Sequence, residues 1–389
     1  MKNKWLYLII LYVSATAVSF GQLKLVPIQG ELPEFSTLMS IFTIAGIILA
    51  IPGGLILAKL GPRKLLLLLL GMLIVGNVIG AVSDLPAMLI AGRVIEGISF
   101  AMIIMVGMVL INIWFADGGA GTATGIFTTF AAIGSFVCMN IGLPLTNAMG
   151  AKAMWWFVAA FTAVCFLLVL FIIKAPEAPP GEEAPETPKI GKALKNLPVW
   201  FIAICQLCVS FLLYGYIYLY PALFQMQYGL SVETANLYNS INGLCGIPAC
   251  VIGGVLISKT GKPFVVLLIG CLGAILTAAL NMSLGSGAAI QIAHLIMCSF
   301  FIGGFALTAN LCIVPILAKS PAYIGYSMAI INMCYFIGIS LCTPMILAMV
   351  NVGGWQQGTL LMVGVAVVAM IFAVLAMTAS RKKLKQEAA

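Results

Sequence analysis

The chain has 389 residues, of which 62% are hydrophobic and only 8% are charged, and its formal net charge is +8. A soluble globular domain carries about 25% charged residues, so this composition excludes a soluble protein and indicates an integral membrane protein. No basic segment interleaved with aromatic residues accompanies the positive charge, which argues against a nucleic-acid partner.

Twelve apolar segments are long enough to cross a bilayer, since a membrane-spanning helix needs about 20 mostly apolar residues. In chain order they are 5–27, 36–58, 64–83, 86–115, 121–147, 153–174, 198–220, 232–257, 264–284, 288–317, 322–350 and 355–379. The first follows a basic start, as in a signal peptide, but its apolar run is longer and no small-residue cleavage site is evident. The sequence therefore predicts an all-α membrane protein with twelve transmembrane helices.

The second segment ends in a short basic turn that recurs 200 residues later. The two stretches read GGLILAKLGPRK from Gly53 and GGVLISKTGKP from Gly253. Further identities share the offset: Ser40/Ser240, Gly46/Gly246, Gly125/Gly325, Pro144/Pro344 and Trp155/Trp355. A repeated unit with an even number of helices relates its copies by an axis along the membrane normal. We therefore expect two pseudo-symmetric six-helix bundles, residues 1–174 and 198–380.

Residues 175–197 separate the two bundles and are rich in Pro and Glu before turning basic. Such a stretch cannot bury enough apolar surface to fold alone, so it is expected to be a linker. If this linker, both termini and the basic tail 381–389 lie in the cytoplasm, then 16 of the 19 Lys and Arg residues lie on the cytoplasmic side. The positive-inside rule favours this orientation, and we expect a multi-pass protein of the inner (plasma) membrane.

Three ionisable residues in or near the membrane spans stand out. Arg93 and Glu96 lie at positions i and i+3 of the fourth segment, so they share a helix face and can pair. Lys24 lies near the end of the first segment. Charged groups in a membrane are costly and indicate function. The alternatives are a structural Arg93–Glu96 pair and a Lys24 side chain that extends to the outer surface.

Polar residues of the second half extend the candidate site. His294, the single histidine, lies opposite Arg93 when the halves are aligned with an offset of 201. Tyr214 and Tyr218 belong to the stretch YGYIYLYP, and Asn332 lies in the eleventh segment. A helix–helix hydrogen bond, an aromatic belt and interhelical packing are the respective alternatives. The C-x-x-C pair Cys205–Cys208 lies within an apolar helix without other ligands, so neither metal nor cofactor is expected.

Together these features resemble the major facilitator superfamily, over nearly the whole chain. The family's loop signature, G-x-x-x-D-[RK]-x-G-[RK]-[RK], is matched here with one residue of slack and without its acidic residue, which is Ala58 in one half and Ser258 in the other. The resemblance implies a gating role for Gly54, Lys59, Gly61, Arg63, Gly254, Lys259 and Gly261. Arg93 and Gly97 also match the family's R-x-x-x-G motif, whereas the helix 5 motif typical of exporters is only partial.

The sequence lacks the motifs of an enzyme or an ATP hydrolase: it contains no H-E-x-x-H, no G-x-S-x-G and no P-loop. A channel would need a ring of charges or carbonyls, whereas an internal repeat favours alternating access. We therefore expect a monomeric secondary transporter of a small organic anion, a carboxylate, working by proton-coupled symport or exchange. The alternative is a proton-coupled exporter of a drug-like or neutral molecule. The expected solute contacts are Lys24, Arg93, Tyr214, Tyr218, His294 and Asn332, with Glu96 as the proton-coupling residue.

Overall fold

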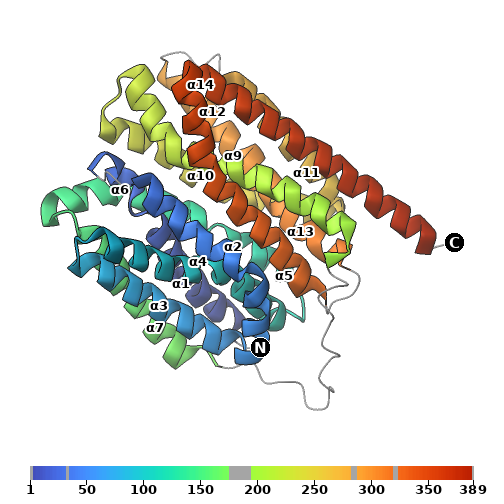
Figure 1. The fold of residues 1–389 in the computed structure, drawn as a ribbon. Coiled ribbons are helices and arrows are strands. Elements are labelled where there is room, and N and C mark those ends of the chain that lie inside the picture. The colour runs from blue at the N-terminus through green and yellow to red at the C-terminus, as the bar shows by residue number, and fades with distance from the viewer. Residues whose placement is uncertain (1–2, 32–34, 175–193, 282–286, 319–322, 388–389) are drawn as a thin grey trace.

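The computed structural model describes residues 3–31, 35–174, 194–281, 287–318 and 323–387, and every regular element in these ranges is a helix. The first half contains α1 (Lys4–Leu23), η1 (Val26–Glu31), α2 (Phe35–Leu60), α3 (Pro62–Val82), α4 (Pro86–Trp114), α5 (Ala120–Thr128), α6 (Phe130–Met149) and α7 (Ala153–Ile172). The second half contains α9 (Leu197–Tyr228), α10 (Val232–Thr260), α11 (Pro263–Leu280), α12 (Ala288–Met297), η3 (Cys298–Ala306), α13 (Leu307–Leu317) and α14 (Ile324–Glu387). Figure 1 shows that most of the long helices run roughly parallel to one another.

The apolar helices agree with an integral membrane protein. Within the described residues, ten helices are long and apolar enough to cross a bilayer, and Thr37–Leu49 of α2 is a shorter apolar stretch. One of the ten, Tyr326–Ser380, has 55 residues, which is more than twice the length needed for one crossing. It is interrupted at Gly353 and Gly354, where the backbone is not helical. Counting α14 as two crossings and adding α2 is compatible with the twelve predicted helices.

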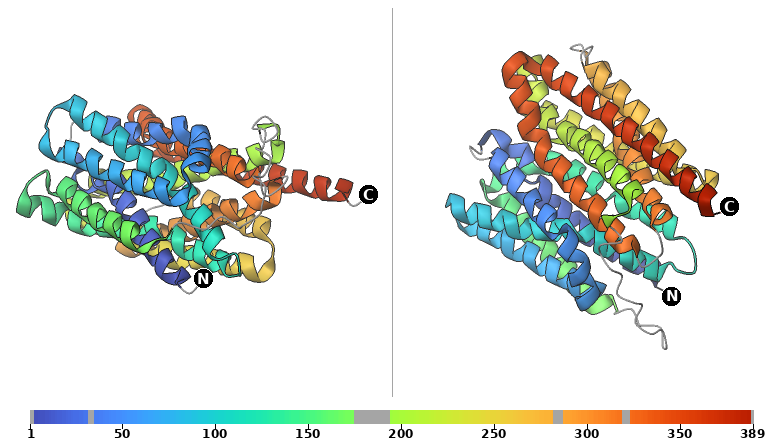
Figure 2. Two further views of the ribbon diagram at one scale, coloured as in Figure 1. Left: turned by 90° about the horizontal axis from the view of Figure 1, so that it is seen from below. Right: turned by 45° about the vertical axis from the view of Figure 1, so that its right-hand side comes forward.

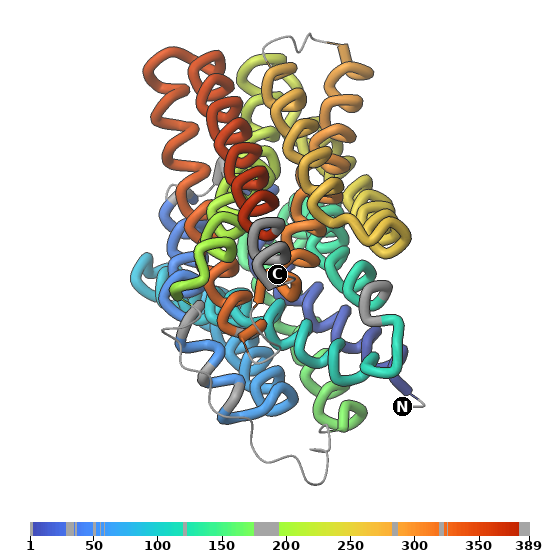
Figure 3. The backbone as a smooth tube through the Cα atoms, turned by 90° about the vertical axis from the view of Figure 1, so that its right-hand side faces the viewer, coloured from blue at the N-terminus to red at the C-terminus, as the bar shows by residue number. Residues whose placement is uncertain are grey.

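The two halves of the chain form two bundles that lie side by side. Figures 2 and 3 show the blue-to-green half beside the yellow-to-red half. Helix α2 packs against α14, and α6 packs against α10, so both contacts join the halves. We call the end of the molecule where α7 finishes and α9 begins the linker end, and the opposite end, which holds the α1–α2 connection, the far end.

Several helix boundaries differ from the sequence-based expectation. Helix α9 was expected to end at residue 220, before Pro221, but it continues to Tyr228 and ends at Gly229 in the left-handed conformation. A membrane bundle tolerates such a proline because neighbouring groups satisfy the freed backbone carbonyl. The predicted spans 121–147 and 288–317 are each divided, the second by the π-helical η3. Most of the predicted linker, 175–193, and tail residues 388–389 lie outside the described residues.

Candidate functional site

Lys24, Arg93 and Glu96 meet inside the first bundle, and we call them the charge cluster. The Lys24 Nζ lies 2.6 Å from Glu96 Oε1, and the Arg93 Nη1 lies 2.8 Å from Glu96 Oε2. Their side chains are at most 2% exposed. Each carboxylate oxygen therefore contacts one cation. Two cations and one carboxylate leave one formal positive charge in the buried interior.

Neighbouring elements supply the remaining contacts of Lys24. Its Nζ donates to Asn77 Oδ1 of α3 at 2.6 Å and lies 5.1 Å from the centre of the Trp155 ring of α7. Lys24 is fully buried at the C-terminal end of α1. The alternative in which this side chain reaches the outer surface is therefore not what the structure shows.

The guanidinium of Arg93 links α4 to the first two helices. Nη1 donates to the Gly21 carbonyl at 2.6 Å, and Nε donates to the Leu38 carbonyl at 3.3 Å. Nη2 lies 3.4 Å from the Gln22 carbonyl, and the group stacks 4.1 Å from the centre of the Phe42 ring. Carbonyl partners compensate part of the desolvation of a buried cation. In this conformation Arg93 has no nitrogen available for a solute unless one of these bonds breaks.

Glycines allow the helices around the charge cluster to approach closely. A methyl group added at Gly97 would overlap the carbonyl oxygen of Phe42 in α2, and one added at Gly76 would contact Glu96 and the Gly92 carbonyl. Gly97 is the glycine of the R-x-x-x-G stretch. Because a methyl group there would overlap the Phe42 carbonyl, this position requires the absence of a side chain. Small residues at such contacts are typical of packed membrane helices.

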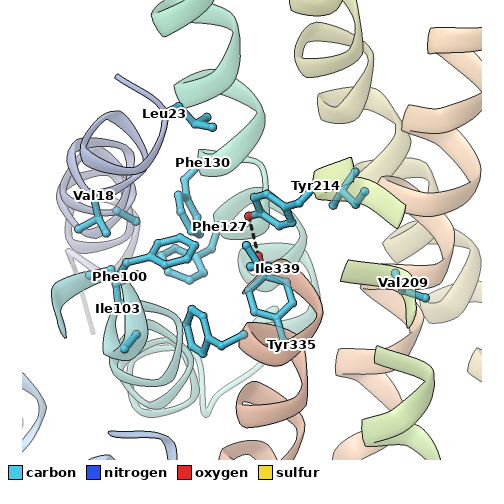
Figure 4. Close-up of a cluster of buried hydrophobic side chains, with 14 of the residues drawn as sticks. Val18, Leu23, Phe100, Ile103, Phe127, Phe130, Val209, Tyr214, Tyr335 and Ile339 are labelled. Carbon is cyan, nitrogen blue, oxygen red and sulfur yellow. Dashed lines mark hydrogen bonds between the residues drawn. The ribbon is translucent and has the colours of Figure 1, made fainter. Parts of the chain in front are cut away.

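Two small cavities lie between the bundles, with volumes of about 60 and 70 Å³. They share Thr128, Ala131, Leu307 and Tyr335 in their linings, and we call them together the interface cavity. Figure 4 shows Tyr214 and Tyr335 pointing toward one another beside Phe127 and Phe130, with 2.7 Å between the hydroxyl oxygens. Within the described residues, the lining contains no charged side chain.

Polar contacts cross between the halves around this cavity. Gln22 Nε2 donates to the Tyr218 hydroxyl at 2.8 Å, and Asn332 Nδ2 donates to the Ala101 carbonyl at 2.9 Å. Asn242 lines the cavity, and its Nδ2 has no hydrogen-bond partner among the described residues. Tyr214, Tyr218 and Asn332 therefore lie at the interface between the halves. Gln22 connects this interface to the charge cluster.

His294 lies apart from the charge cluster, inside the second bundle. Its Nδ1 lies 2.7 Å from the Tyr220 hydroxyl, and its Nε2 lies 2.6 Å from the Thr277 carbonyl. The structure therefore brings Lys24, Arg93 and Glu96 together but leaves His294 separate. Sequence reasoning missed Gln22, Asn77, Tyr220 and Asn281 as partners; the isolated Asn77 in the leucine-rich third segment was a usable signal.

The repeated basic turns lie at the linker end. Gly61 and Gly261 both have positive φ, 75° and 63°, a conformation that favours glycine. Arg63 donates from Nε and Nη2 to the Ile173 and Leu170 carbonyls at the end of α7. Lys59 and Lys259 are exposed in the last turns of α2 and α10. Gly54 and Gly254 have no atom within 4 Å of an added methyl group.

Comparison with known proteins agrees with this architecture. The curated relatives include the lysosomal dipeptide transporter MFSD1 of Bos taurus, 25% identical over 166 residues, which is 38% of this chain and 36% of that protein. The human (Homo sapiens) protein of the same name is 24% identical over an equal length. The aligned region thus spans about a third of these relatives, with 36% of each covered.

A solved structure shares the fold over almost the full length. It is described as the human organic anion transporter MFSD10 (TETRAN), with a TM-score of 0.75 at 15% identity, covering 95% of this chain and 99% of that one. The family model of the Major Facilitator Superfamily matches residues 5–342. The chain is therefore a multi-pass membrane transporter rather than an enzyme, and it belongs to the major facilitator superfamily.

Proposed function

We propose that this protein moves a small organic anion, a carboxylate, by proton-coupled alternating access, as symport or exchange. The observation that carries the proposal is the bridging position of Glu96, whose two oxygens hold Lys24 at 2.6 Å and Arg93 at 2.8 Å. A solute carboxylate offers the same two oxygens. It can replace Glu96 as the bridge between the two cations, because guanidinium groups bind carboxylates well in such geometry.

Protonation of Glu96 is the coupling step. A neutral Glu96 no longer balances the cations, and the cluster changes from one to two formal positive charges. Arrival of a carboxylate returns it to one. Loading a proton and an anion together therefore leaves the charge of the cluster unchanged, which lowers the cost of moving the halves around it in a low-dielectric interior.

The route to the charge cluster runs through Gln22. Its carbonyl accepts from Arg93, and its amide donates to Tyr218 of the other half. Separation of the halves breaks the Gln22–Tyr218 bond and exposes this side of the cluster. Tyr214, Tyr218 and Asn332 then contact the solute from the interface, and the turns carrying Lys59, Arg63 and Lys259 gate the linker end, which we assign to the cytoplasm. Bundles 1–174 and 198–380 move as units in a monomer.

A second candidate, export of a neutral or drug-like molecule against protons, draws on the interface cavity itself. Among the described residues its lining is uncharged and carries hydroxyl and amide groups such as Tyr214, Ser135 and Asn242. A neutral solute would fit this lining without help from Lys24 or Arg93. The two candidates therefore differ in whether the charge cluster is required for binding.

The test is uptake of labelled solutes into proteoliposomes with and without an inward proton gradient. A small monocarboxylate, a dipeptide and a neutral amide should be compared. We expect carboxylate uptake to be proton-driven, and Glu96→Gln to retain exchange while losing most proton-driven accumulation. Asp117→Asn, which changes an exposed acid, is the matched control and should behave as wild type. If Glu96→Gln accumulates the carboxylate normally, Glu96 is only a structural partner of Arg93.

Variants of the two cations, Lys24 and Arg93, distinguish the two candidate functions. If Lys24→Gln and Arg93→Gln lose carboxylate exchange while folding normally, the anion proposal stands. If both variants still carry out exchange of the neutral amide and the wild type never binds the carboxylate, the exporter of a neutral solute is supported instead. Thermal unfolding in the presence of each solute provides the binding measurement, because a ligand that binds only the folded state stabilises it.

A further inference from the structure

A cavity of about 310 Å³ lies within the second bundle, near its far end and away from the interface cavity. It is formed by the end of α9, α11 and the two parts of α14. Its lining includes the aromatic residues Tyr216, Tyr220 and Trp355 and the amides Gln227, Asn281 and Gln356. We call it the C-terminal pocket. Nothing assigned to the charge cluster or to the interface cavity uses it.

His294 lies directly behind this pocket and connects to it through a chain of hydrogen bonds. From the histidine outward, Nδ1 lies 2.7 Å from the Tyr220 hydroxyl, which lies 2.7 Å from Asn281 Oδ1. The Asn281 Nδ2 lies 3.2 Å from the Tyr216 hydroxyl. Three of the four members therefore line the pocket, and the fourth is a buried titratable group.

The direction of these hydrogen bonds depends on the protonation of His294 and on the orientation of the Asn281 amide. Thr277 presents a carbonyl, which only accepts, so the nearby Nε2 must carry a proton. Tyr220 has one hydroxyl proton, and with Asn281 Oδ1 facing it that proton goes to Asn281. The Nδ1 must then donate to the Tyr220 oxygen. With this orientation of the Asn281 amide, the chain is fully satisfied only when both ring nitrogens of His294 are protonated.

The neutral form requires the opposite direction. With Nδ1 as an acceptor, Tyr220 donates its proton to His294, and the Asn281 amide must rotate to present its nitrogen to Tyr220. Asn281 Oδ1 then accepts from Tyr216. In the protonated state Tyr216 accepts from Asn281, and its own proton points either toward the oxygen of the neighbouring Tyr220 or into the pocket, where a ligand can accept it. Protonation of His294 thus changes Tyr216 from a group engaged within the chain to a donor available to a ligand.

The groups around these four residues determine whether a charge on His294 is balanced. Outside the hydrogen-bonded series itself, the titratable groups that interact with its members are Tyr228 of α9 and Cys298 of η3. The centre of the Tyr216 ring lies 5.8 Å from the centre of the imidazole. Within the described parts of the sequence, no Lys, Arg, Asp or Glu is hydrogen bonded or ion-paired to any of the four members. Among the described residues, a positive charge on His294 therefore has no carboxylate partner, and a ligand could bring one.

We propose that the C-terminal pocket is a second binding site, for a small organic acid with a flat apolar body, and that binding there is linked to protonation of His294. The carboxylate accepts from Tyr216 and balances the imidazolium through the chain, and the body of the ligand stacks among Trp355, Tyr216 and Tyr220. The site is separate from the charge cluster and does not depend on it.

The experiment uses benzoate as the probe and a cysteine at the pocket rim as the reporter. Gln227→Cys places a thiol in the lining, whereas Met226→Cys, its exposed neighbour, lines a different opening and is the control. The rate of labelling by a bulky charged maleimide is measured on the full-length protein. Each rate is divided by the rate measured without benzoate at the same pH. The parent protein corrects for its own 11 cysteines.

We expect benzoate to protect Gln227→Cys but not Met226→Cys from labelling. The benzoate concentration for half-protection should be about tenfold lower near pH 6 than near pH 8, as expected when binding is linked to uptake of a proton. Tyr220→Phe, which keeps the ring but interrupts the chain, and His294→Gln should each reduce this dependence to less than twofold. Lys24→Gln should leave it intact, which separates this site from the charge cluster. Absence of protection of Gln227→Cys by benzoate, or an unchanged pH dependence when Tyr220→Phe is added to it, would overturn the proposal.

Discussion

The charge cluster and the hydrogen-bonded residues around His294 include positions that correspond in the sequences of the two halves, but the two sites are built differently. Trp155 corresponds to Trp355 and Asn77 to Thr277 at an offset of 200, and Arg93 to His294 at 201. In the first bundle Trp155 packs against a buried ion pair, while in the second Trp355 lines a cavity of about 310 Å³. A buried ion pair needs close partners, whereas the hydrogen-bonded series from His294 to Tyr216 contains no ion pair and borders an open space.

Removing the acid from the charge cluster should have the largest effect on stability. Glu96→Leu leaves two buried cations without their carboxylate, and breaking a buried pair in this way costs about 3–5 kcal/mol. His294→Leu removes the hydrogen bonds to Tyr220 and Thr277 but no ion pair, and should cost about 1–3 kcal/mol. Thermal unfolding of the purified proteins in detergent compares them. Equal losses would show that the two bundles do not differ in the way described.

The corresponding tryptophans test packing rather than charge. Trp155 is buried, at 3% exposure, and covers Lys24, so Trp155→Ala should cost about 3–5 kcal/mol. Trp355 is half-buried at the edge of a cavity, so Trp355→Ala should cost about 1 kcal/mol. Unfolding measurements on both variants check the ratio. A larger loss from Trp355→Ala would indicate that the C-terminal pocket is filled in solution.

The sequence predicted one of these sites better than the other, for a physical reason. The Arg93–Glu96 contact follows from helical spacing, so one segment is enough to predict it. The contacts of Lys24 with Asn77 and Glu96 join α1, α3 and α4, and spacing within a segment carries no information about them. The same holds for Tyr220 and Asn281, from α9 and α11. Helix positions and the family were therefore predictable, but the membership of the clusters was not.

A smaller change tests why the first bundle packs so closely. Gly97→Ala places a methyl group against the Phe42 carbonyl, a backbone atom that cannot rotate away, and should cost about 1–3 kcal/mol. It should also separate α2 from α4 and weaken the Arg93 bond to the Leu38 carbonyl. Gly364→Ala is the control, since no atom lies within 4 Å of its added methyl group. A stable Gly97→Ala protein would show that α2 and α4 adjust freely.

The contact that joins the bundles should have an effect of about 1 kcal/mol. Tyr218→Phe removes the hydrogen bond from Gln22 across the interface, and a bond of this kind contributes about 1 kcal/mol. Opening of the interface should become about fivefold more frequent, measured as faster labelling of Ser135→Cys in the cavity lining. Tyr12→Phe is the matched control, because the Tyr12–Thr129 bond lies within one bundle. Equal labelling rates would show that Gln22–Tyr218 does not hold the halves together.

The smallest effect on stability is expected at an ion pair of the first bundle that is exposed to solvent rather than buried. Lys4 Nζ lies 2.7 Å from Asp117 Oδ1 at the linker end, where Asp117 is 59% exposed. The hydrogen bond from Lys4 lowers the pKa of Asp117, so any stabilisation is present above the ordinary carboxyl pKa and is lost as the pH falls through the lowered one. Lys4→Gln should therefore leave stability near neutral pH almost unchanged, since exposed pairs contribute little, and should return the pKa of Asp117 toward its ordinary value. Carboxyl NMR titration of Asp117 measures the shift directly, and added salt should reduce it in the wild type. If Lys4→Gln destabilised the protein as much as Glu96→Leu, burial would not be what distinguishes the charge cluster from an ordinary ion pair.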